Sequence, residues 1–255
     1  MELVVGGKYH ESGQLEAYAL KQLGLKPENS VVDVGCGTGR LAVALERFLA
    51  GNYCGTDILS ESLDYARRRC RRADWNFLET RDNTIPVLDQ SADFVVFFSV
   101  FTHLLDEDIF RYLLEARRIA KSTAKIVFSY LDFECEAHWP LFLQTAANRE
   151  TGSVLNKFTT ETAIRRLARG AGLKVNALYS GQQRWISVDS AIVCEDGREL
   201  LDLVGFGQSV AVLDVFPEKK YLALYPDVRQ AVEAGVFYSG SHHYDVCGHK
   251  EGRET

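Results

Sequence analysis

The sequence predicts an α/β protein built around a doubly wound, mostly parallel β-sheet. Short β-branched segments alternate with amphipathic segments over the first two thirds of the chain, and such alternation requires right-handed crossovers between parallel strands. The continuous apolar segment 92–98 has the character of a strand buried on both faces of a sheet. The chain of 255 residues, 46% hydrophobic and 25% charged, is long enough for one large domain with a small appendage.

Apolar residues at helical spacing, together with terminal signals, mark the expected helices. In 11–23 the apolar residues Leu15, Ala19 and Leu23 recur along one stripe, and Gly24 follows as the C-cap. The segment 106–120 begins with acidic residues and ends with basic ones, as the helix dipole favours. The expected helices are 11–23, 41–49, one capped by Ser60, 106–120 and 160–171.

Strands are expected where short apolar or β-branched segments lie between these helices, at 31–34, 52–56, 75–78, 92–98, 124–130, 173–179 and 208–215. The alternation breaks at the aromatic-rich segment 131–158 and again at 181–206. We therefore expect a domain over 1–217 that carries these two segments as insertions or a lid. Residues 218–255 are expected to form a small helical tail, with one helix from Pro226 to Ala234 and a second short helix from Ser241 to Cys247.

A glycine-rich turn follows the first expected strand. The run Val31-Val32-Asp33-Val34-Gly35-Cys36-Gly37-Thr38-Gly39-Arg40 ends a strand in an acid, alternates three glycines and begins a helix. Glycines let the backbone turn sharply and approach a ligand closely, and helix N-terminal amides point into the same space. The carboxylate of Asp33 suits a cationic amine at the opening of the strand. The pattern predicts a cofactor site at this turn.

Two further acids follow the next two strands. Asp57 ends the second strand, where a carboxylate can accept hydrogen bonds from both ribose hydroxyls, and Ile58 beside it can cover one face of a purine. Asp82 follows the third strand, next to Asn83, and can accept a bond from an exocyclic amine. Any one of these acids alone is typical of a turn or helix cap. Three in succession favour a nucleoside-containing cofactor.

The segment from Val31 to Tyr130 resembles the class I S-adenosylmethionine-dependent methyltransferases. The family's glycine motif matches 33–39, its ribose acid Asp57, its adenine-side acid Asp82 and its fourth-strand signature 93–104. The resemblance implies a Rossmann-like seven-stranded sheet whose last strand is antiparallel, with 181–206 joining the sixth and seventh strands. It implies S-adenosyl-L-methionine as cofactor and S-adenosyl-L-homocysteine as product. The expected cofactor-binding residues are Asp33, Gly35, Cys36, Gly37, Gly39, Asp57, Ile58, Asp82, Asn83 and Ser99.

His103 is the candidate general base. It follows the fourth strand at the carboxyl edge of the sheet, and a base typically adds about 10² to 10⁴ in rate when the acceptor must lose a proton. A histidine that caps the following helix is the alternative. Tyr9, Tyr130 and Trp139 are candidate acceptor-binding residues, because they lie where a lid or acceptor wall is expected and aromatic faces suit sugars and cations.

The tail is similar to a short module found in bacterial proteins of surface-glycan biosynthesis. The similarity lies in Tyr221-Leu222-Ala223-Leu224-Tyr225-Pro226-Asp227-Val228 and in the residues around Gly235, His243 and Gly248. That module usually has asparagine before the proline, where this chain has Tyr225. The resemblance implies a small-molecule or sugar acceptor, with O-methylation in surface polysaccharide or secondary metabolism, and a tail that associates with glycosyltransferases.

Two alternatives remain open at this point. The run Gly37-Thr38-Gly39-Arg40-Leu41-Ala42 also fits a dinucleotide fingerprint, with Asp57 near the expected ribose spacing, so an NAD(P)-dependent oxidoreductase is one. That frame leaves Asp33, Gly35 and Asp82 without a role. The other is a non-catalytic, cofactor-binding scaffold for glycan assembly.

Composition and cysteine usage set the expected compartment and partners. The net charge of -6 argues against sequence-independent nucleic-acid binding, which needs a basic surface. The six cysteines are scattered, no long apolar stretch marks a signal peptide or membrane span, and reduced thiols in the cytoplasm are expected. The histidines and cysteine near 242–249 match no standard zinc spacing, so no metal is expected.

Overall fold

The computed structural model describes residues 9–147, 156–179, 183–189, 218–233, 243, 247–248 and 250–253. The chain divides into two compact units, 1–201 and 202–255. Within the described residues, no helix has the length and apolar character needed to cross a membrane.

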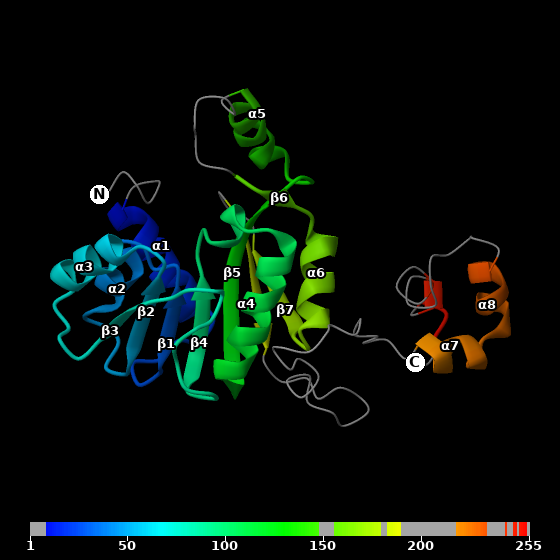
Figure 1. The fold of residues 1–255 in the computed structure, drawn as a ribbon, viewed down its shortest axis with the longest axis horizontal. Coiled ribbons are helices and arrows are strands. Elements are labelled where there is room, and N and C mark those ends of the chain that lie inside the picture. The colour runs from blue at the N-terminus through cyan, green and yellow to red at the C-terminus, as the bar shows by residue number, and fades with distance from the viewer. Residues whose placement is uncertain are drawn as a thin grey trace. The chain divides into compact units, whose positions relative to one another are not determined.

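The first unit contains a mixed sheet with strand order β3-β2-β1-β4-β5-β8-β7 (Figure 1). Strands β1 to β5 run parallel, while β8 lies antiparallel between β5 and β7. The short strand β6 pairs with the end of β5. The strands are β1 (Val31–Val34), β2 (Tyr53–Asp57), β3 (Asn76–Glu79), β4 (Ala92–Phe97), β5 (Ala120–Asp132), β6 (Phe158–Thr159), β7 (Lys174–Tyr179) and β8 (Arg184–Asp189).

Helices cover both faces of this sheet. Helices α1, α2 and α3 pack together on one face, and α4 and α6 pack together on the other (Figure 1). The helices of this unit are α1 (Tyr9–Gln22), α2 (Arg40–Leu45), α3 (Ser60–Arg69), α4 (Asp106–Ile119), α5 (Trp139–Ala147) and α6 (Glu161–Gly170), with short 3₁₀ helices η2 (Phe101–His103) and η3 (Glu136–His138). The doubly wound α/β fold is therefore confirmed.

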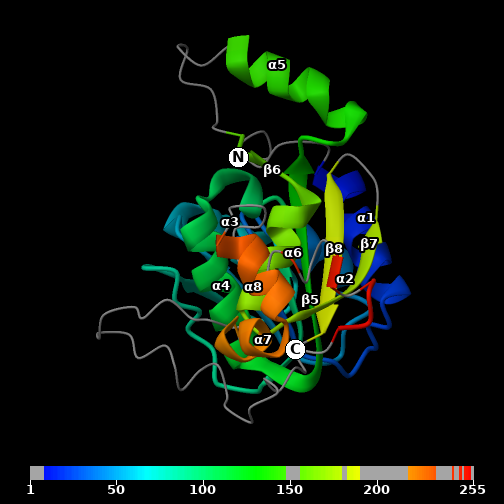
Figure 2. The same ribbon diagram turned by 90° about the vertical axis from the view of Figure 1, so that its right-hand side faces the viewer.

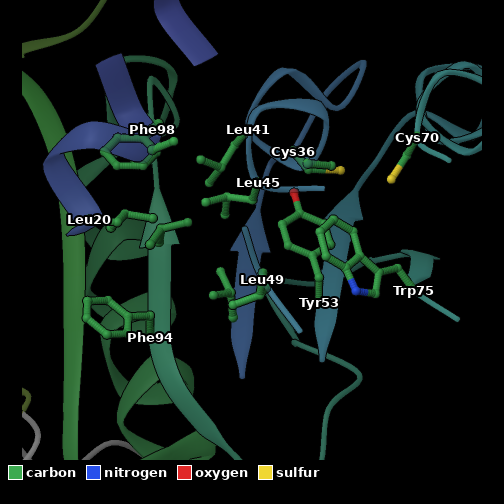
Figure 3. Packing of buried hydrophobic residues seen from close by; sticks show 14 of the residues in the cluster. Leu20, Cys36, Leu41, Leu45, Leu49, Tyr53, Cys70, Trp75, Phe94 and Phe98 are labelled. Atoms are coloured by element: carbon green, nitrogen blue, oxygen red, sulfur yellow. The ribbon is translucent and has the colours of Figure 1, made fainter. Parts of the chain in front are cut away.

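The main core lies between the sheet and helices α1 to α3. Figure 3 shows Leu20, Leu41 and Leu45 from the helices packed on this face of the sheet. At its edge the Tyr53 ring stacks on Trp75, with ring centroids 4.7 Å apart. This packing fixes the carboxyl ends of β1 and β2 relative to the helices that follow them.

The buried face of α1 differs from the stripe that the sequence predicts. Leu15 is 55% exposed, whereas Gly13, Glu16, Ala17 and Leu20 are buried. The cause is the close approach of α1 to α2: a β-carbon at Gly13 would lie 2.4 Å from the carbonyl oxygen of Arg40. Contact at a glycine rotates the helix away from the face that apolar spacing alone indicates. The predicted cap is also wrong, since Leu59 occupies the N-cap position of α3 and Ser60 begins the helix.

The seventh strand of the path lies elsewhere than predicted. Strand β8 (Arg184–Asp189) falls inside the segment 181–206 that was expected to join two strands. It pairs with β5 from Lys125↔Asp189 to Tyr130↔Arg184, so the connection from β7 is a short hairpin rather than a long excursion. The predicted strand at 208–215 lies outside the described residues. An antiparallel strand does complete the sheet, as the resemblance implied.

The insertion at 131–158 contains the helices η3 and α5 between the end of β5 and the start of β6. Helix α5 lies beyond the edge of the sheet at which β5 ends, in both orthogonal views (Figures 1 and 2). No residue of α5 is buried. The segment returns to the sheet through β6, which pairs with the last residues of β5 at Leu131↔Phe158 and Asp132↔Thr159.

The second unit contains α7 (Glu218–Leu224) and α8 (Pro226–Glu233). A helix from Pro226 to Ala234 was predicted, and the structure describes a helix over Pro226–Glu233, with residue 234 outside the described residues. The Tyr221 hydroxyl lies 3.1 Å from Nδ1 of His243, and Arg253 makes two hydrogen bonds to the Asp227 carboxylate. The predicted boundary at residue 217 and most of the second predicted tail helix, 241–247, lie outside the described residues.

Candidate active site

The glycine-rich turn joins β1 to α2 with three left-handed residues. The φ angles of Gly35, Gly37 and Gly39 are 70°, 53° and 82°, a region that residues with a β-carbon rarely adopt. The backbone amides of Gly35 and Cys36 both donate to the carbonyl of Thr56 in β2, at 2.7 and 2.9 Å. A β-carbon on Gly35 would lie 2.5 Å from Val100. The alternating glycines are thus required by the backbone path itself.

Asp57 organises this turn from the end of β2. Its Oδ2 accepts a hydrogen bond from the amide of Gly37 at 2.9 Å, and its Oδ1 accepts one from the amide of Leu59 at 2.9 Å. Each carboxylate oxygen has a second lone pair, so Asp57 retains acceptor capacity for two hydroxyls of a ligand. Ile58 beside it is 67% exposed and offers an apolar surface. This geometry fits the predicted ribose-binding role.

Asp33 lies beneath the turn in a buried position. Its Oδ2 accepts a 2.5 Å hydrogen bond from the hydroxyl of Tyr53. Burial raises the pKa of Asp33 from 3.8 to about 7, and the Tyr53 hydrogen bond opposes that rise. A carboxylate held in this way gains from a nearby cationic ligand group, because the ligand's charge offsets the cost of burial.

The sequence did not predict a buried ion pair, Glu16–Arg40, that lies next to the same turn. Arg40 contacts the Glu16 carboxylate, with 2.5 Å between Nη2 and Oε1, and also donates to the hydroxyl of Ser99 at 3.3 Å. Gln183 donates to the same Ser99 hydroxyl at 3.0 Å. Burial raises the pKa of Glu16 to about 7, against the effect of the neighbouring Arg40. The available signals were the arginine directly after the last glycine and a glutamate between apolar positions of α1.

Ser99 joins this network at the end of β4. Its φ is 61°, and its amide donates to the hydroxyl of Ser129 in β5 at 2.8 Å. A serine in the left-handed region is held there only by its surroundings. The structure therefore brings Ser99 and Arg40, from strands and helices distant in sequence, to one edge of the sheet together with the glycine turn.

Asp82 and Asn83 follow β3 in a tight loop. Both have φ of 56°, and the Asn83 amide group donates to the Asp108 carboxylate at 2.6 Å. The amide of Thr80 donates to the carbonyl of Asp57 at 3.0 Å, which ties this loop to the end of β2. Asp82 is exposed, so its carboxylate is accessible to a ligand.

The candidate base His103 ends η2, directly after β4, and is exposed. Its backbone amide donates to the carbonyl of Val100 at 3.0 Å. The neighbouring carbonyl of Thr102 accepts a hydrogen bond from the amide of Lys157 at 2.6 Å. His103 thus lies at the carboxyl edge of the sheet, beside the end of the insertion that follows β5.

The three candidate acceptor residues occupy different environments. The Tyr9 hydroxyl donates to the carbonyl of Thr38 at 2.9 Å, which clamps the glycine turn to the start of α1. Tyr130 is 1% exposed, its hydroxyl has no hydrogen-bond partner among the described residues, and burial raises its pKa. Trp139 is 46% exposed. No group of three or more potential metal ligands occurs among the described residues.

In sequence, the chain is similar to known methyltransferases. Residues 32–128 match the model of a methyltransferase domain. The chain is 26% identical over 124 residues to a ribosomal protein L11 methyltransferase of Thermotoga petrophila, which covers 49% of this chain and 45% of that protein. It is 28% identical over 130 residues to a probable cobalt-precorrin-6B C(15)-methyltransferase of Thermoplasma acidophilum, covering 48% and 63%. The chain spans about half the length of the curated relatives it matches.

Solved structures share the fold. A magnesium protoporphyrin IX methyltransferase from Synechocystis PCC 6803 with bound S-adenosylhomocysteine superposes with a TM-score of 0.56 at 17% identity, covering 71% of this chain and 83% of that one. A SAM-dependent methyltransferase from Aquifex aeolicus gives 0.55 at 22% identity, covering 68% and 88%.

The sheet order also bears on the nicotinamide alternative. A dinucleotide-binding fold of the order 3-2-1-4-5-6 ends in parallel strands, whereas β8 here is inserted antiparallel between β5 and β7. The domain match at 32–128, the shared fold and the geometry of the glycine turn with Asp57 together support an S-adenosylmethionine-dependent methyltransferase.

Proposed function

We propose that the protein transfers a methyl group from S-adenosylmethionine to a hydroxyl oxygen of a small molecule, sugar or glycan. The observation that carries the cofactor part is the Asp57 carboxylate, which orders the glycine turn and retains acceptor capacity for two ribose hydroxyls. The cofactor, when bound, supplies an electrophilic sulfonium methyl group.

Different residues of the chain bind different parts of the cofactor. Asp57 binds the ribose, and Ile58 covers one face of the adenine. Asp82 and Asn83, in the loop after β3, bind the adenine edge. The turn that contains Gly35, Cys36, Gly37 and Gly39 passes close to the methionine part, whose ammonium group pairs with Asp33. Ser99 closes the site from the end of β4.

His103 acts as the general base that removes the acceptor's proton. Its position at the end of η2, on the carboxyl edge of the sheet, supports this role. Alignment of the acceptor with the methyl group supplies the larger share of the barrier reduction, about 7 to 11 kcal/mol for a well-oriented pair, and the base adds about 10² to 10⁴ in rate.

The sugar or glycan acceptor rests on the tail's resemblance to a module of surface-glycan biosynthesis proteins and on the exposed aromatic side chain of Trp139. The relatives named for ribosomal protein L11 and for a precorrin each align with about half of this chain. We place the reaction in the cytoplasm, in surface polysaccharide or secondary metabolism, with the tail associating with glycosyltransferases. The free thiols of Cys36, Cys54 and Cys70 suit a reducing compartment.

The test is methyl transfer from radiolabelled S-adenosylmethionine to a panel of sugars, glycans and small-molecule hydroxyls, with wild type and His103→Ala. His103→Ala is expected to lower kcat by about 10² or more while the dissociation constant for S-adenosylhomocysteine stays unchanged. Glu28→Ala, which removes an exposed titratable side chain of the same unit, serves as the control and retains activity. The helix-cap alternative for His103 is wrong, because Leu105 occupies the N-cap of α4. Loss of stability with normal turnover would therefore give His103 a structural role and no role as the base.

A further inference from the structure

The insertion after β5 begins with a fixed buried turn. The amide of Asp132 donates to Nδ1 of His138 at 2.9 Å, and His138 is 2% exposed. The Asp132 carboxylate accepts from the amide of Glu134 at 2.9 Å and lies 3.0 Å from Nε of Arg184 in β8. A buried histidine and a buried ion pair therefore determine the direction in which η3 and α5 leave the sheet.

The end of the insertion is fixed as well. The amide of Phe133 donates to the carbonyl of Thr159 at 2.9 Å, and the amide of Lys157 donates to the carbonyl of Thr102 at 2.6 Å. Thr102 immediately precedes His103. The end of the insertion thus lies against η2, next to His103, the proposed general base.

Four aromatic rings pack together in a cluster where the insertion joins the sheet: Phe133, Trp139, Phe142 and Phe158. Phe133 packs on Phe158 and on Phe142, each with ring centroids 5.4 Å apart. Trp139 stacks on Phe142 at 4.9 Å with an interplanar angle of 21°. One face of the indole is covered by Phe142, and the side chain is still 46% exposed.

A hollow of about 160 Å³ opens at this cluster, lined by Phe133, Glu136 and Trp139. Pockets for drug-sized ligands span roughly 300 to 1,000 Å³, so this hollow takes a single ring. Glu136 is exposed, and no described cation forms an ion pair with it. The hollow is therefore lined by two aromatic side chains and by a carboxylate that only accepts hydrogen bonds.

We propose that this hollow is the acceptor subsite and that it binds one sugar ring, an assignment that rests on the proposed methyl transfer. The apolar face of the sugar stacks on the open side of Trp139, and its hydroxyls donate to the Glu136 carboxylate. Recognition of a quaternary ammonium typically uses a cage of several aromatic faces. Here Trp139 presents one side, since Phe142 covers the other. A single open indole face beside one carboxylate can stack on the apolar face of a sugar while the carboxylate accepts hydrogen bonds from its hydroxyls.

Saturation-transfer NMR with the full chain and excess S-adenosylhomocysteine tests the subsite. The probes are the methyl pyranosides of glucose, mannose and rhamnose, with choline as the cationic comparison. Wild type is expected to transfer saturation to at least one pyranoside. Trp139→Ala should weaken that binding by about fivefold to tenfold, as loss of a ring contact predicts, and Glu136→Gln should weaken it less. Leu143→Ala removes another exposed apolar side chain of α5 and should leave binding unchanged.

Transfer to choline alone, to none of the pyranosides, or to pyranosides equally in wild type and Trp139→Ala would overturn the proposal. Calorimetry with S-adenosylhomocysteine, run on the same samples, separates this failure from a failure of the proposed function. Normal cofactor binding without sugar binding removes only the subsite. Sugar binding without cofactor binding removes the methyl transfer and leaves a carbohydrate-binding hollow.

Discussion

At the residue scale, Asp57 links the backbone and the ligand. Its two carboxylate oxygens hold the amides of Gly37 and Leu59, so the glycine turn and the start of α3 are ordered before any ligand arrives. Charge-assisted bonds of this kind are stronger than neutral ones. A site ordered in advance loses less conformational entropy on binding.

Replacing this carboxylate should therefore remove both its hydrogen bonds to the ligand and its ordering of the glycine turn. Asp57→Ala is expected to weaken S-adenosylhomocysteine binding by about 2 to 3 kcal/mol, because two charge-assisted contacts to ribose are lost. Isothermal titration calorimetry measures the change. Asp64→Ala removes an exposed carboxylate of α3 and is the matched control. Unchanged affinity in a folded Asp57→Ala variant would remove Asp57 from the cofactor site.

The raised pKa of Asp33 predicts a pH-dependent stability. Burial raises this pKa to about 7 in the folded protein, from 3.8 for the free side chain. Between these values the folded state holds a proton that the unfolded state has released, so the contribution of Asp33 to stability falls as pH rises toward 7. Asparagine can still accept the Tyr53 hydrogen bond but does not titrate.

Urea unfolding of wild type and Asp33→Asn from pH 5 to pH 8 tests this. The stability of the variant relative to wild type should increase with pH up to about 7 and then stay level. Asp74→Asn provides the comparison, since the hydrogen bond from Arg72 lowers the pKa of that exposed carboxyl to about 2 and no change is expected in this range. A constant difference between Asp33→Asn and wild type would show that Asp33 is ionised throughout.

At the scale of elements, the glycine turn sets the distance between α2 and α3. Gly39 has a φ of 82°, and a β-carbon there would lie 2.8 Å from the β-carbon of Ala66. A side chain at position 39 would therefore be destabilising for two reasons: the strain of the left-handed backbone and a clash between the two helices. Gly24 carries the first cost without the second, since its φ is 95° and a β-carbon added there would meet nothing within 4 Å.

The two glycines make a matched pair of substitutions. Gly24→Ala should destabilise the protein by about 1 kcal/mol through backbone strain, and Gly39→Ala by about 2 to 4 kcal/mol because overpacking is added. Chemical denaturation monitored by circular dichroism gives both values. Equal losses would mean that α2 and α3 move apart freely and that the close packing at Gly39 does not constrain the site.

Local sequence patterns predicted most of the parallel half of the sheet, because its strands are short apolar runs between recognisable helices. They did not predict β8, since Arg184–Asp189 is a strand through its pairing with β5, more than 50 residues earlier in the chain. The same contrast holds in the site and the insertion beside it. Asp33, the three glycines and Asp57 form one motif, whereas the Glu16–Arg40 pair and the Arg184–Asp132 contact arise only when separate elements pack.

At the scale of the whole molecule, the second unit has contacts that hold it together internally. Arg253 pairs with Asp227 and lies over the ring of Tyr225, 4.8 Å from its centroid. These contacts join the end of the chain to α8. Deleting residues 218–255 should therefore leave a soluble protein that binds S-adenosylhomocysteine with wild-type affinity. Gel filtration and calorimetry test this, and an insoluble or non-binding product would make the tail part of the first unit's core or site.

We expect the glycine turn and Asp57 to bind S-adenosylmethionine rather than a dinucleotide. Calorimetric titration of the full chain with S-adenosylhomocysteine, and in parallel with NADH and NADPH, measures this directly. One-site binding of S-adenosylhomocysteine is expected, with no binding of either dinucleotide. Binding of NADH or NADPH without binding of S-adenosylhomocysteine would show that the turn is a dinucleotide site.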